Sequence, residues 1–514
     1  MNRIKNILNL SEENKDILVF ISLFVLMLAV YVNLLGTSAF YSDSSELVVK
    51  SYTLGIPHEP GYPIYTWMAH LFTMLPIGNV AYRVNLMSAF FGALSVSLIY
   101  LIVLNIVRIV YKKKFHPYAS SFISVTAALS LAFSRTFWSQ AEIAEVYTFN
   151  AFFVCIMILL LLKWAETRNI KLLYMFSLFY GLSLGAHISN ILFAPAFLAF
   201  IVLTDKKIFF IRRNMAVVGL VFLLGASQYL YLFSGPDSKI LGINSIEKWI
   251  GYVSGFDQFQ SYYFAFNVFE NPQRIAVYTD LLKINFFILG LGIGIIGMWE
   301  LFKRNFRIFA LLFLMFSFNI WFFIQTSFWD INVMLIPSFV IFSIFLGFGA
   351  NVIVIFMEKS LCHIKASVAK KYKDYLRVFK KAVIITLIIT FMIIPLMSYF
   401  LNYSEAERLK STDYGNFVSK ALDEIPENSV IITDWAYFYV YKYYQIVEKL
   451  NQHVDIEYTE SEGLMKALSE NIYNRRVFVH PYYMDTGSSF EKYDAVPFIV
   501  FPDGTTLYEM KEKE

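Results

Sequence analysis

Hydrophobic residues are gathered in long blocks along most of the chain, and polar residues separate one block from the next. A transmembrane α-helix needs about 20 mainly apolar residues, because each residue rises 1.5 Å and the hydrocarbon core is about 30 Å thick. The pattern predicts about eleven such helices, the third and fifth of them short. Their approximate ranges are 17–35, 85–107, 119–133, 143–162, 171–185, 188–203, 215–233, 284–300, 308–326, 333–356 and 382–400. The chain is therefore expected to be a mainly α-helical, polytopic membrane protein.

Composition supports a membrane protein, because 57% of the residues are hydrophobic and 16% are charged, whereas soluble domains carry about 25% charged residues. Lysine and arginine indicate the orientation. With a cytoplasmic N-terminus, the inner segments hold 25 of these residues and the outer segments hold 7. Because positive charge collects on the cytoplasmic side, we expect this orientation in the cell (plasma or inner) membrane, with the chain after residue 401 outside.

The pattern changes in that last part, residues 402–514, which we expect to be a small extracytoplasmic α/β domain following a transmembrane domain over residues 1–401. Short apolar strands are predicted at 429–433, 454–458 and 477–480, with helices between them. An Asp503-Gly504 turn between two further strand-like runs predicts a β-hairpin.

The first predicted outer loop, residues 36–83, carries the strongest candidates for chemistry. Asp43 and Glu46 open a helical stretch, and His58 and Glu59 lie in a segment with three prolines, followed by Tyr62. We expect two short helices along the membrane surface, joined by a rigid Pro/Gly turn. The structural alternative is a capping box of Asp43 with Glu46 and a Glu46–Lys50 pair on one helix face. However, ionisable groups near the hydrocarbon edge are costly, which favours a functional role.

Three further segments fall on the same outer side. One, just before the fourth span, contains Gln140, Glu142, Glu145 and Tyr147, although Ser139 and Glu142 also fit a capping box. His187 lies between the fifth and sixth spans, where a turn histidine is often structural. Asp330 and Asn332 are weaker candidates near the interface. Arg83 and Arg135 are the outer cations most suitable for binding an anion.

Several classes of protein are disfavoured by what the sequence lacks. It contains no glycine-rich nucleotide-binding loop and no Cys/His spacing typical of zinc. It also lacks the nucleophile elbow of α/β-hydrolases. We therefore expect no resident cofactor and no defined metal site, although these absences do not exclude a divalent metal.

The motifs of the outer segments resemble those of a known multi-pass family. The resemblance rests on Ser42–Leu47, Thr53–Tyr65 and Tyr82–Leu94, together with Phe137-Trp138-Ser139-Gln140 and Glu145-Val146-Tyr147. The family was long described only as a domain of unknown function. It has a eukaryotic protein O-mannosyltransferase as a relative and belongs to the GT-C glycosyltransferase superfamily. The similarity is dense over residues 41–200 and thins afterwards.

The resemblance implies a GT-C-type helix bundle that takes a sugar, mannose or another hexose, from a polyprenyl-phosphate donor. It also implies that Asp43 is the catalytic base of a single inverting displacement onto Ser or Thr hydroxyls of exported proteins. His58, Arg83, Arg135 and His187 would then bind the donor phosphate. The acceptor or the sugar would contact Glu46, Glu59, Tyr62, Gln140, Glu142, Glu145 and Tyr147.

Two departures from the family pattern concern the donor pocket. Ser45 stands where the family commonly has glycine, and Glu59 separates His58 from Pro60 where the family often has His-Pro. Neither change removes the carboxylate of Asp43.

Two other functions remain open. The same enzyme class could glycosylate a lipid or a cell-envelope glycan instead of a protein. A lipid or solute transporter is the third hypothesis, but the sequence lacks the internal repeat and the paired interrupted helices typical of one. The C-terminal domain, on the predicted side of the active site, could present or select the acceptor. No nucleic-acid partner is expected.

Overall fold

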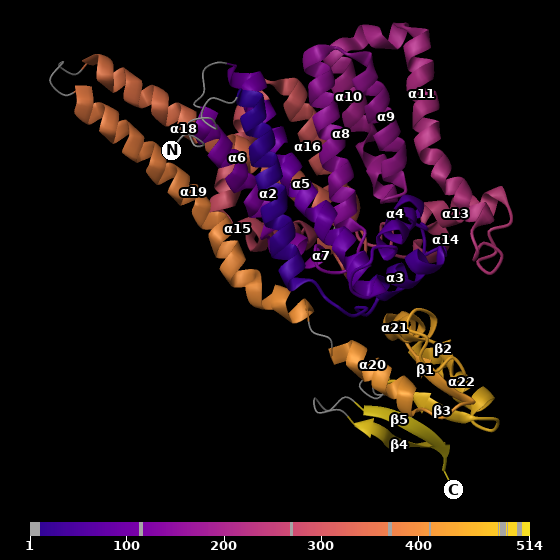
Figure 1. Cartoon of the computed structure of the whole chain (residues 1–514). Helices are drawn as coiled ribbons and strands as arrows, with labels where there is room; N and C mark the ends of the chain where they lie inside the picture. Colours follow the sequence, from indigo (N-terminus) through magenta and orange to yellow (C-terminus); the bar gives the residue numbers. More distant parts are fainter. Residues whose placement is uncertain are drawn as a thin grey trace.

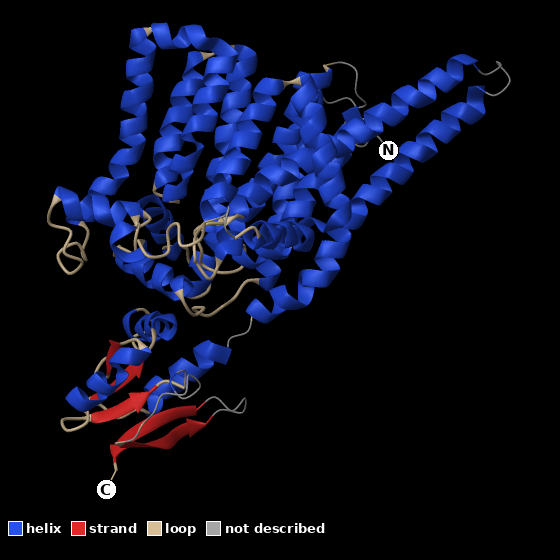
Figure 2. Cartoon of the chain, turned by 180° about the vertical axis from the view of Figure 1, so that it is seen from behind, coloured by secondary structure: helices blue, strands red, loops and turns tan. Residues whose placement is uncertain are grey.

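The structure is a computed structural model that describes residues 11–112, 117–267, 271–367, 373–410, 413–481, 483, 490, 492–500 and 506–513. Figure 1 shows a large helix bundle with a smaller sheet-containing domain at one end, and Figure 2 shows the same arrangement from behind. The prediction of a polytopic helical membrane protein with a small C-terminal α/β unit is confirmed at the level of fold.

Each predicted span coincides with a helix of the bundle. Nine apolar helices of the described chain are long enough to cross a bilayer, and the third and fifth are shorter, as expected. The helices are α2 (Glu12–Leu34), α5 (Val80–Tyr111), α6 (Pro117–Ala132), α8 (Tyr147–Thr167), α9 (Ile170–Leu184), η1 (Ile188–Phe193) continuing into α10 (Ala194–Asp205), α11 (Arg212–Ala226), α15 (Gln273–Arg304), α16 (Phe306–Phe323), α18 (Ile336–Ser367) and α19 (Lys373–Leu409). Hydrophobic block length alone therefore located the membrane helices.

Burial separates the central helices from the peripheral ones. In the most apolar stretch of each helix, 89% of the residues are buried in α18 and 78% in α5, but only 22% in α2, α11 and α19. Leucine side chains on α11, among them Leu220 and Leu224, are exposed to the surroundings. Such apolar exposure is tolerated in lipid, where the helices need only satisfy their own backbone hydrogen bonds.

The basic segment at residues 358–381, between the last two predicted spans, is largely helical. α18 continues to Ser367 and α19 begins at Lys373, with the residues between them outside the described chain. The two helices extend past the rest of the bundle as a long pair (Figure 1).

Helices α15 and α18 approach each other closely through two glycines. A Cβ on Gly297 would lie 2.0 Å from the carbonyl oxygen of Phe345, and a Cβ on Gly349 would lie 2.1 Å from that of Ile293. Neither distance leaves room for a side chain. Small residues of this kind let transmembrane helices gain van der Waals contact that lipid cannot supply.

The C-terminal domain contains a five-stranded sheet in the order β2-β1-β3-β5-β4. The first three strands are parallel, and β5 runs antiparallel to both β3 and β4. The predicted strands and hairpin are confirmed, while the Asp503-Gly504 turn lies outside the described residues. The elements are α20 (Asp413–Glu424), β1 (Ser429–Thr433), α21 (Trp435–Ile446), β2 (Asp455–Tyr458), α22 (Leu464–Asn471), β3 (Arg476–Val479), β4 (Tyr493–Val500) and β5 (Thr506–Glu512).

Short helices at one end of the bundle face this domain (Figure 1). The first outer loop forms α3 (Asp43–Thr53) and α4 (Pro63–Thr73), joined by a Pro/Gly segment, as predicted. Two more, α13 (Ile246–Ser254) and α14 (Phe256–Phe259), come from the segment between α11 and α15. The C-terminal domain docks through α21, where the carbonyl of Ala436 accepts a hydrogen bond of 2.7 Å from the amide of Ser42.

We predict that Gly297→Ala destabilises the protein, because the added methyl group must push α15 away from the backbone of α18. Overpacking of this kind costs about 1–3 kcal/mol. Thermal unfolding of the purified protein in detergent should show a midpoint lowered by several degrees. Gly292→Ala on the same helix is the matched control, since a Cβ there would have nothing within 4 Å. Equal midpoints for the two variants would contradict the packing role of Gly297.

Candidate active site

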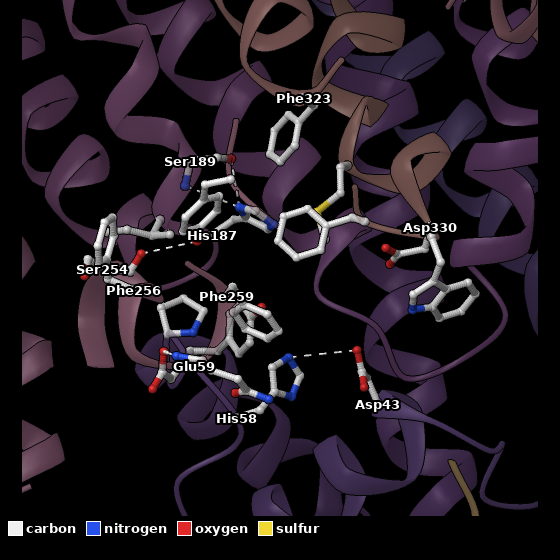
Figure 3. A pocket seen from close by; sticks show the side chains of 18 of the residues that line it. Asp43, His58, Glu59, His187, Ser189, Ser254, Phe256, Phe259, Phe323 and Asp330 are labelled. Atoms are coloured by element: carbon white, nitrogen blue, oxygen red, sulfur yellow. Dashed lines mark hydrogen bonds and ion pairs between the residues drawn. The ribbon is translucent and has the colours of Figure 1, made fainter. Parts of the chain in front are cut away.

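A cavity of about 630 Å³ lies where the end of the bundle meets the C-terminal domain. Figure 3 shows side chains that line it from close by. One part of its wall is apolar and comes from η1, α16 and nearby loops. The other part is polar and comes from the first outer loop, the segment between α11 and α15, α21 and the end of β2. The polar lining comprises Ser42, Asp43, His58, Glu59, Tyr62, Tyr147, His187, Ser189, Ser254, Gln258, Tyr263, Asp330, Trp435, Tyr458 and Glu460.

Asp43 is the first residue of α3, and its side chain is 35% exposed toward this cavity. One carboxylate oxygen, Oδ2, lies 3.9 Å from Nε2 of His58. The other, Oδ1, accepts a hydrogen bond of 3.3 Å from the indole Nε1 of Trp435. The carboxylate is thus held by partners on two sides and still reaches open space, which suits a group that must accept a proton from a substrate.

His58 also binds Glu46, one turn further along α3. The buried carboxylate of Glu46 accepts bonds from the amide nitrogen of His58 (3.0 Å) and from its Nδ1 (2.5 Å). Burial by itself lowers the pKa of His58, but the charges of Asp43 and Glu46 outweigh this and raise the pKa to about 10. The ring is therefore a cation at neutral pH, placed between two carboxylates.

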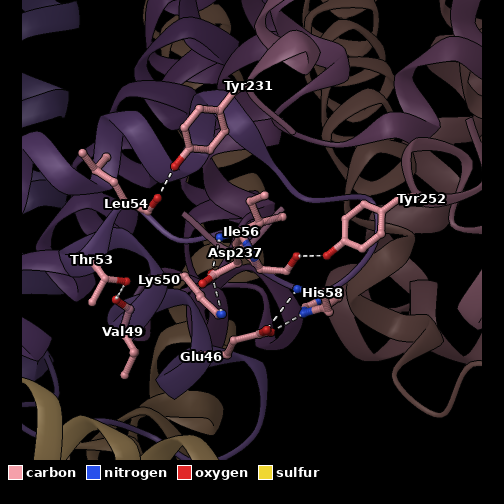
Figure 4. Close-up of polar contacts among 11 residues, drawn as sticks. Glu46, Val49, Lys50, Thr53, Leu54, Ile56, His58, Tyr231, Asp237 and Tyr252 are labelled. Carbon is pink, nitrogen blue, oxygen red and sulfur yellow. Dashed lines mark hydrogen bonds and ion pairs between the residues drawn. The ribbon is translucent and has the colours of Figure 1, made fainter. Parts of the chain in front are cut away.

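The first outer loop is also fixed from the opposite side by the segment between α11 and α15 (Figure 4). The carboxylate of Asp237 binds Nζ of Lys50 at 2.8 Å and accepts a bond from the amide of Ile56 at 2.9 Å. The hydroxyl of Tyr252 donates to the carbonyl of Pro57 at 2.5 Å. The predicted alternative of a Glu46–Lys50 pair is wrong, because each of these side chains has found a partner on another segment.

Glu59 and Tyr62 belong to the same turn. Glu59 lines the cavity and accepts a bond of 2.9 Å from the amide of Gln258 in α14, and burial raises the pKa of its carboxyl group. Tyr62, the residue before α4, adopts a positive φ of 38° and contacts the rings of His58 and His187. The turn therefore brings two predicted residues into the cavity and links α4 to α14.

The opposite wall contains Tyr147, His187 and Asp330. The hydroxyl of Tyr147 donates to Oδ2 of Asp330 at 3.3 Å. Burial, followed by the nearby charge of Asp43, raises the pKa of Asp330 to about 6. Nδ1 of His187 accepts from the hydroxyl of Ser189 at 2.8 Å, and burial lowers the pKa of His187 to about 4. His187 is therefore neutral and offers hydrogen bonds without a charge.

Other predicted residues lie outside the cavity lining. Gln140 and Glu142 are buried behind it, and burial raises the pKa of Glu142 to about 8. Glu145 also lies behind the lining, and burial together with the charges of Asp43 and Asp330 raises its pKa. The alternative of a Ser139–Glu142 capping box is wrong, because Ser139 lies inside α7 (Arg135–Gln140) and its hydroxyl donates to the carbonyl of Thr136. Glu46 does not line the cavity either and acts on it through His58.

The structure does not place either of the two arginines expected to bind phosphate in the cavity lining. The guanidinium of Arg83 donates to the carbonyls of Thr73 (2.6 Å), Ile77 (2.7 Å) and Gly78 (2.8 Å), so it closes the end of α4. Arg135 is the exposed first residue of α7 (Arg135–Gln140) and lies outside the lining. Among the described lining residues there is no lysine or arginine, which leaves His58 as the cationic side chain.

Asp43, Glu46 and His58 are also the described residues whose ligand atoms could meet around a metal ion, since these atoms lie within 4.8 Å of one another. Imidazole binds a metal only in its neutral form. A divalent cation would therefore have to displace the proton that His58 holds between the two carboxylates.

Residues of the C-terminal domain and of the segment between α11 and α15 were not predicted as part of the site. Trp435, Tyr458 and Glu460, like Gln258, reach the cavity only through the packing of distant segments. No local pattern marks them. The one local signal is the junction between a predicted strand and a predicted helix just before Trp435. Such a junction is also expected for structural reasons alone, so it does not identify a site.

Comparisons with known proteins agree with this architecture. Residues 43–208 match the family described as the Protein O-mannosyl-transferase TMEM260 N-terminal domain. Protein O-mannosyl-transferase TMEM260 of Mus musculus is 34% identical over 29% of this chain and 20% of its own length. The Dictyostelium discoideum protein of the same name is 24% identical over 50% of this chain and 33% of its own. This chain thus spans about a fifth to a third of these curated relatives.

Solved structures share the fold across nearly the whole chain. ArnT from Cupriavidus metallidurans, bound to undecaprenyl phosphate, superposes with a TM-score of 0.59 at 11% identity, covering 96% of this chain and 97% of that one. Its apo form gives 0.59 at 12% identity, with 97% and 98% covered. The GT-C-type fold and the resemblance of the N-terminal part, both predicted from the sequence, are confirmed.

The charge on His58 predicts a pH-dependent contribution to stability. Its pKa in the folded protein, about 10, lies above the unfolded value of about 6.5. The contribution is therefore fully present below pH 6.5 and is lost as the pH rises toward 10. We expect wild-type protein in detergent to lose more thermal stability between pH 6.5 and 10 than His58→Gln.

The exposed His453 provides the control. The unfolding midpoint of His453→Gln should stay within about one degree of wild type at each pH. Between pH 6.5 and 10, the midpoint of wild type should fall by several degrees more than that of His58→Gln. Parallel curves for wild type and His58→Gln would show that the ring carries no charge between the carboxylates.

Proposed function

We propose that this chain is a membrane glycosyltransferase that moves a hexose, mannose by analogy with its relatives, from a polyprenyl-phosphate donor to Ser or Thr hydroxyls of exported proteins. The observation that carries the proposal is the carboxylate of Asp43, partly exposed in a cavity that is apolar at one end and polar at the other. The names of the relatives support a protein acceptor.

The apolar end suits the polyprenyl chain. Ile191 and Phe264 there are 49% and 58% exposed, and Leu192, Phe322 and Phe323 line the adjoining cavity wall. A chain of isoprene units would cover this surface and leave the phosphate at the polar end. That ArnT of the same fold was crystallised with undecaprenyl phosphate supports a donor of this kind.

The reaction needs a base and a means to stabilise the leaving group. Asp43 would accept the proton of the acceptor hydroxyl while the oxygen of that hydroxyl bonds to C1 of the sugar. The bond from C1 to the phosphate oxygen breaks on the opposite face, the configuration inverts, and polyprenyl phosphate departs. The proton then passes from Asp43 to water. The imidazolium of His58 would offset charge on the departing phosphate, which Arg83 and Arg135 are not placed to do.

The sugar would lie between the two polar walls. Tyr62, Tyr147, His187 and Asp330 offer hydroxyl, imidazole and carboxyl groups to its hydroxyls. Glu59 would contact the sugar or the acceptor near α14. Glu145 does not line the cavity, but its carboxyl group interacts electrostatically with Asp43 and Asp330 and would influence their protonation.

We also propose that the cavity and the C-terminal domain face the outside of the cell membrane. The strong excess of lysine and arginine in the opposite set of loops supports this orientation. Acceptors would then meet the enzyme after export, and the donor would present its sugar on the outer leaflet.

The orientation predicts how introduced cysteines react. In a background of Cys155→Ser and Cys362→Ser, we expect Glu462→Cys to react with a membrane-impermeant maleimide in intact cells. Lys206→Cys, at the other end of the bundle, should react only after permeabilisation. The reverse pattern would place the cavity in the cytosol and remove the proposed function.

The catalytic role predicts that Asp43→Asn lowers transfer of radiolabelled hexose from a polyprenyl-phosphate donor to Ser/Thr peptides by about 10²–10⁴. The purified variant should still bind polyprenyl phosphate, because the asparagine keeps the shape of the site. Asp280→Asn, on the exposed surface of α15, is the matched control and should retain wild-type transfer. Unchanged transfer by Asp43→Asn would exclude Asp43 as the base. Label appearing in lipid or glycan, and not in peptide, would favour the alternative acceptor.

A further inference from the structure

We infer that the C-terminal domain forms an acceptor subsite at the polar end of the cavity, and that its occupant is a polypeptide segment with a basic side chain beside the reacting hydroxyl. The inference rests on the proposed function and specifies the acceptor of that same site. Three residues carry it, namely Trp435, Tyr458 and Glu460.

The first observation is that this domain is docked directly on the candidate base. Nε1 of Trp435, the first residue of α21, donates to Oδ1 of Asp43 at 3.3 Å. One residue away, the carbonyl of Ala436 accepts from the amide of Ser42, and Tyr437 stacks on Tyr41. A hydroxyl approaching Asp43 at this end of the cavity therefore passes along the surface of the C-terminal domain.

The second observation is the character of that surface. The ring of Tyr458 is 40% exposed and packs edge-to-face against Trp435, with centroids 5.7 Å apart. The hydroxyl of Tyr458 donates to the exposed carboxylate of Glu460 at 3.2 Å. Aromatic faces beside a carboxylate suit a lysine or arginine side chain, whose apolar stem packs on the rings while its charged end meets the carboxylate.

The third observation is the charge of the whole cavity. Its described lining holds four carboxylate side chains, Asp43, Glu59, Asp330 and Glu460, against the single cation His58. His58 is already paired with Asp43 and Glu46, so it does not offset the carboxylates of Glu59, Asp330 and Glu460, which are free to act on the acceptor. A cleft lined by one sign of charge concentrates ligands of the opposite sign. Glu460 is the member of this set that the C-terminal domain supplies.

The experiment compares peptides that share one Ser/Thr core and differ in flanking lysine, alanine or glutamate. At low ionic strength, we expect wild type to use the lysine peptide about fivefold better in kcat/KM than the glutamate peptide, mainly through KM. Glu460→Lys should reverse the order, with KM for the donor unchanged. Glu460→Gln should abolish the preference.

Glu462→Lys is the matched control, because this glutamate is exposed two residues away and does not line the cavity. It should keep the wild-type order. An identical ranking in wild type and Glu460→Lys would overturn the acceptor subsite while leaving the transferase intact. No transfer by wild type to any peptide would instead count against the proposed protein acceptor. Thermal unfolding of each variant, compared with wild type, shows that a changed ranking does not come from misfolding.

Discussion

The site depends on one buried electrostatic arrangement, the protonated ring of His58 between the carboxylates of Asp43 and Glu46. A buried carboxylate such as Glu46 is costly unless a charged partner and hydrogen bonds compensate it. His58 supplies both through its ring and its backbone amide. The same ring fixes the Pro-rich turn against α3, so the geometry of the loop and the charge of the cavity come from a single interaction.

A second ion pair completes the arrangement from outside the loop. Lys50 pairs with Asp237, which also holds the amide of Ile56. Glu46 thus joins α3 to His58 within the loop, and Asp237 joins Lys50 and Ile56 of the loop to the segment between α11 and α15. The loop is therefore held as a rigid wall. The proposed role of Asp43 as a base requires such a wall, because its carboxylate must meet the substrate in one orientation.

The sequence predicted the parts of the structure that depend on local pattern. Block length located the membrane helices, and the helical stretch opened by Asp43 and Glu46, together with the prolines after it, predicted two short helices joined by a turn. The errors concern partners. Arg83 was assigned to the phosphate from its side of the membrane, but three nearby carbonyls bind its guanidinium first. Trp435 lies 392 residues from Asp43 along the chain, and Glu460 lies further still, so no local pattern places them in the cavity.

The walls of the cavity come from stretches of chain with separate origins in the sequence. Asp43, His58 and His187 fall within residues 43–208, the part that matches a described family, whereas Trp435, Tyr458 and Glu460 lie far beyond it. Under the proposed function, the residues that make the new bond and the residues that select the acceptor would therefore lie in different parts of the polypeptide. If so, exchanging the C-terminal domain would direct the enzyme to other acceptors without any change to the residues around Asp43.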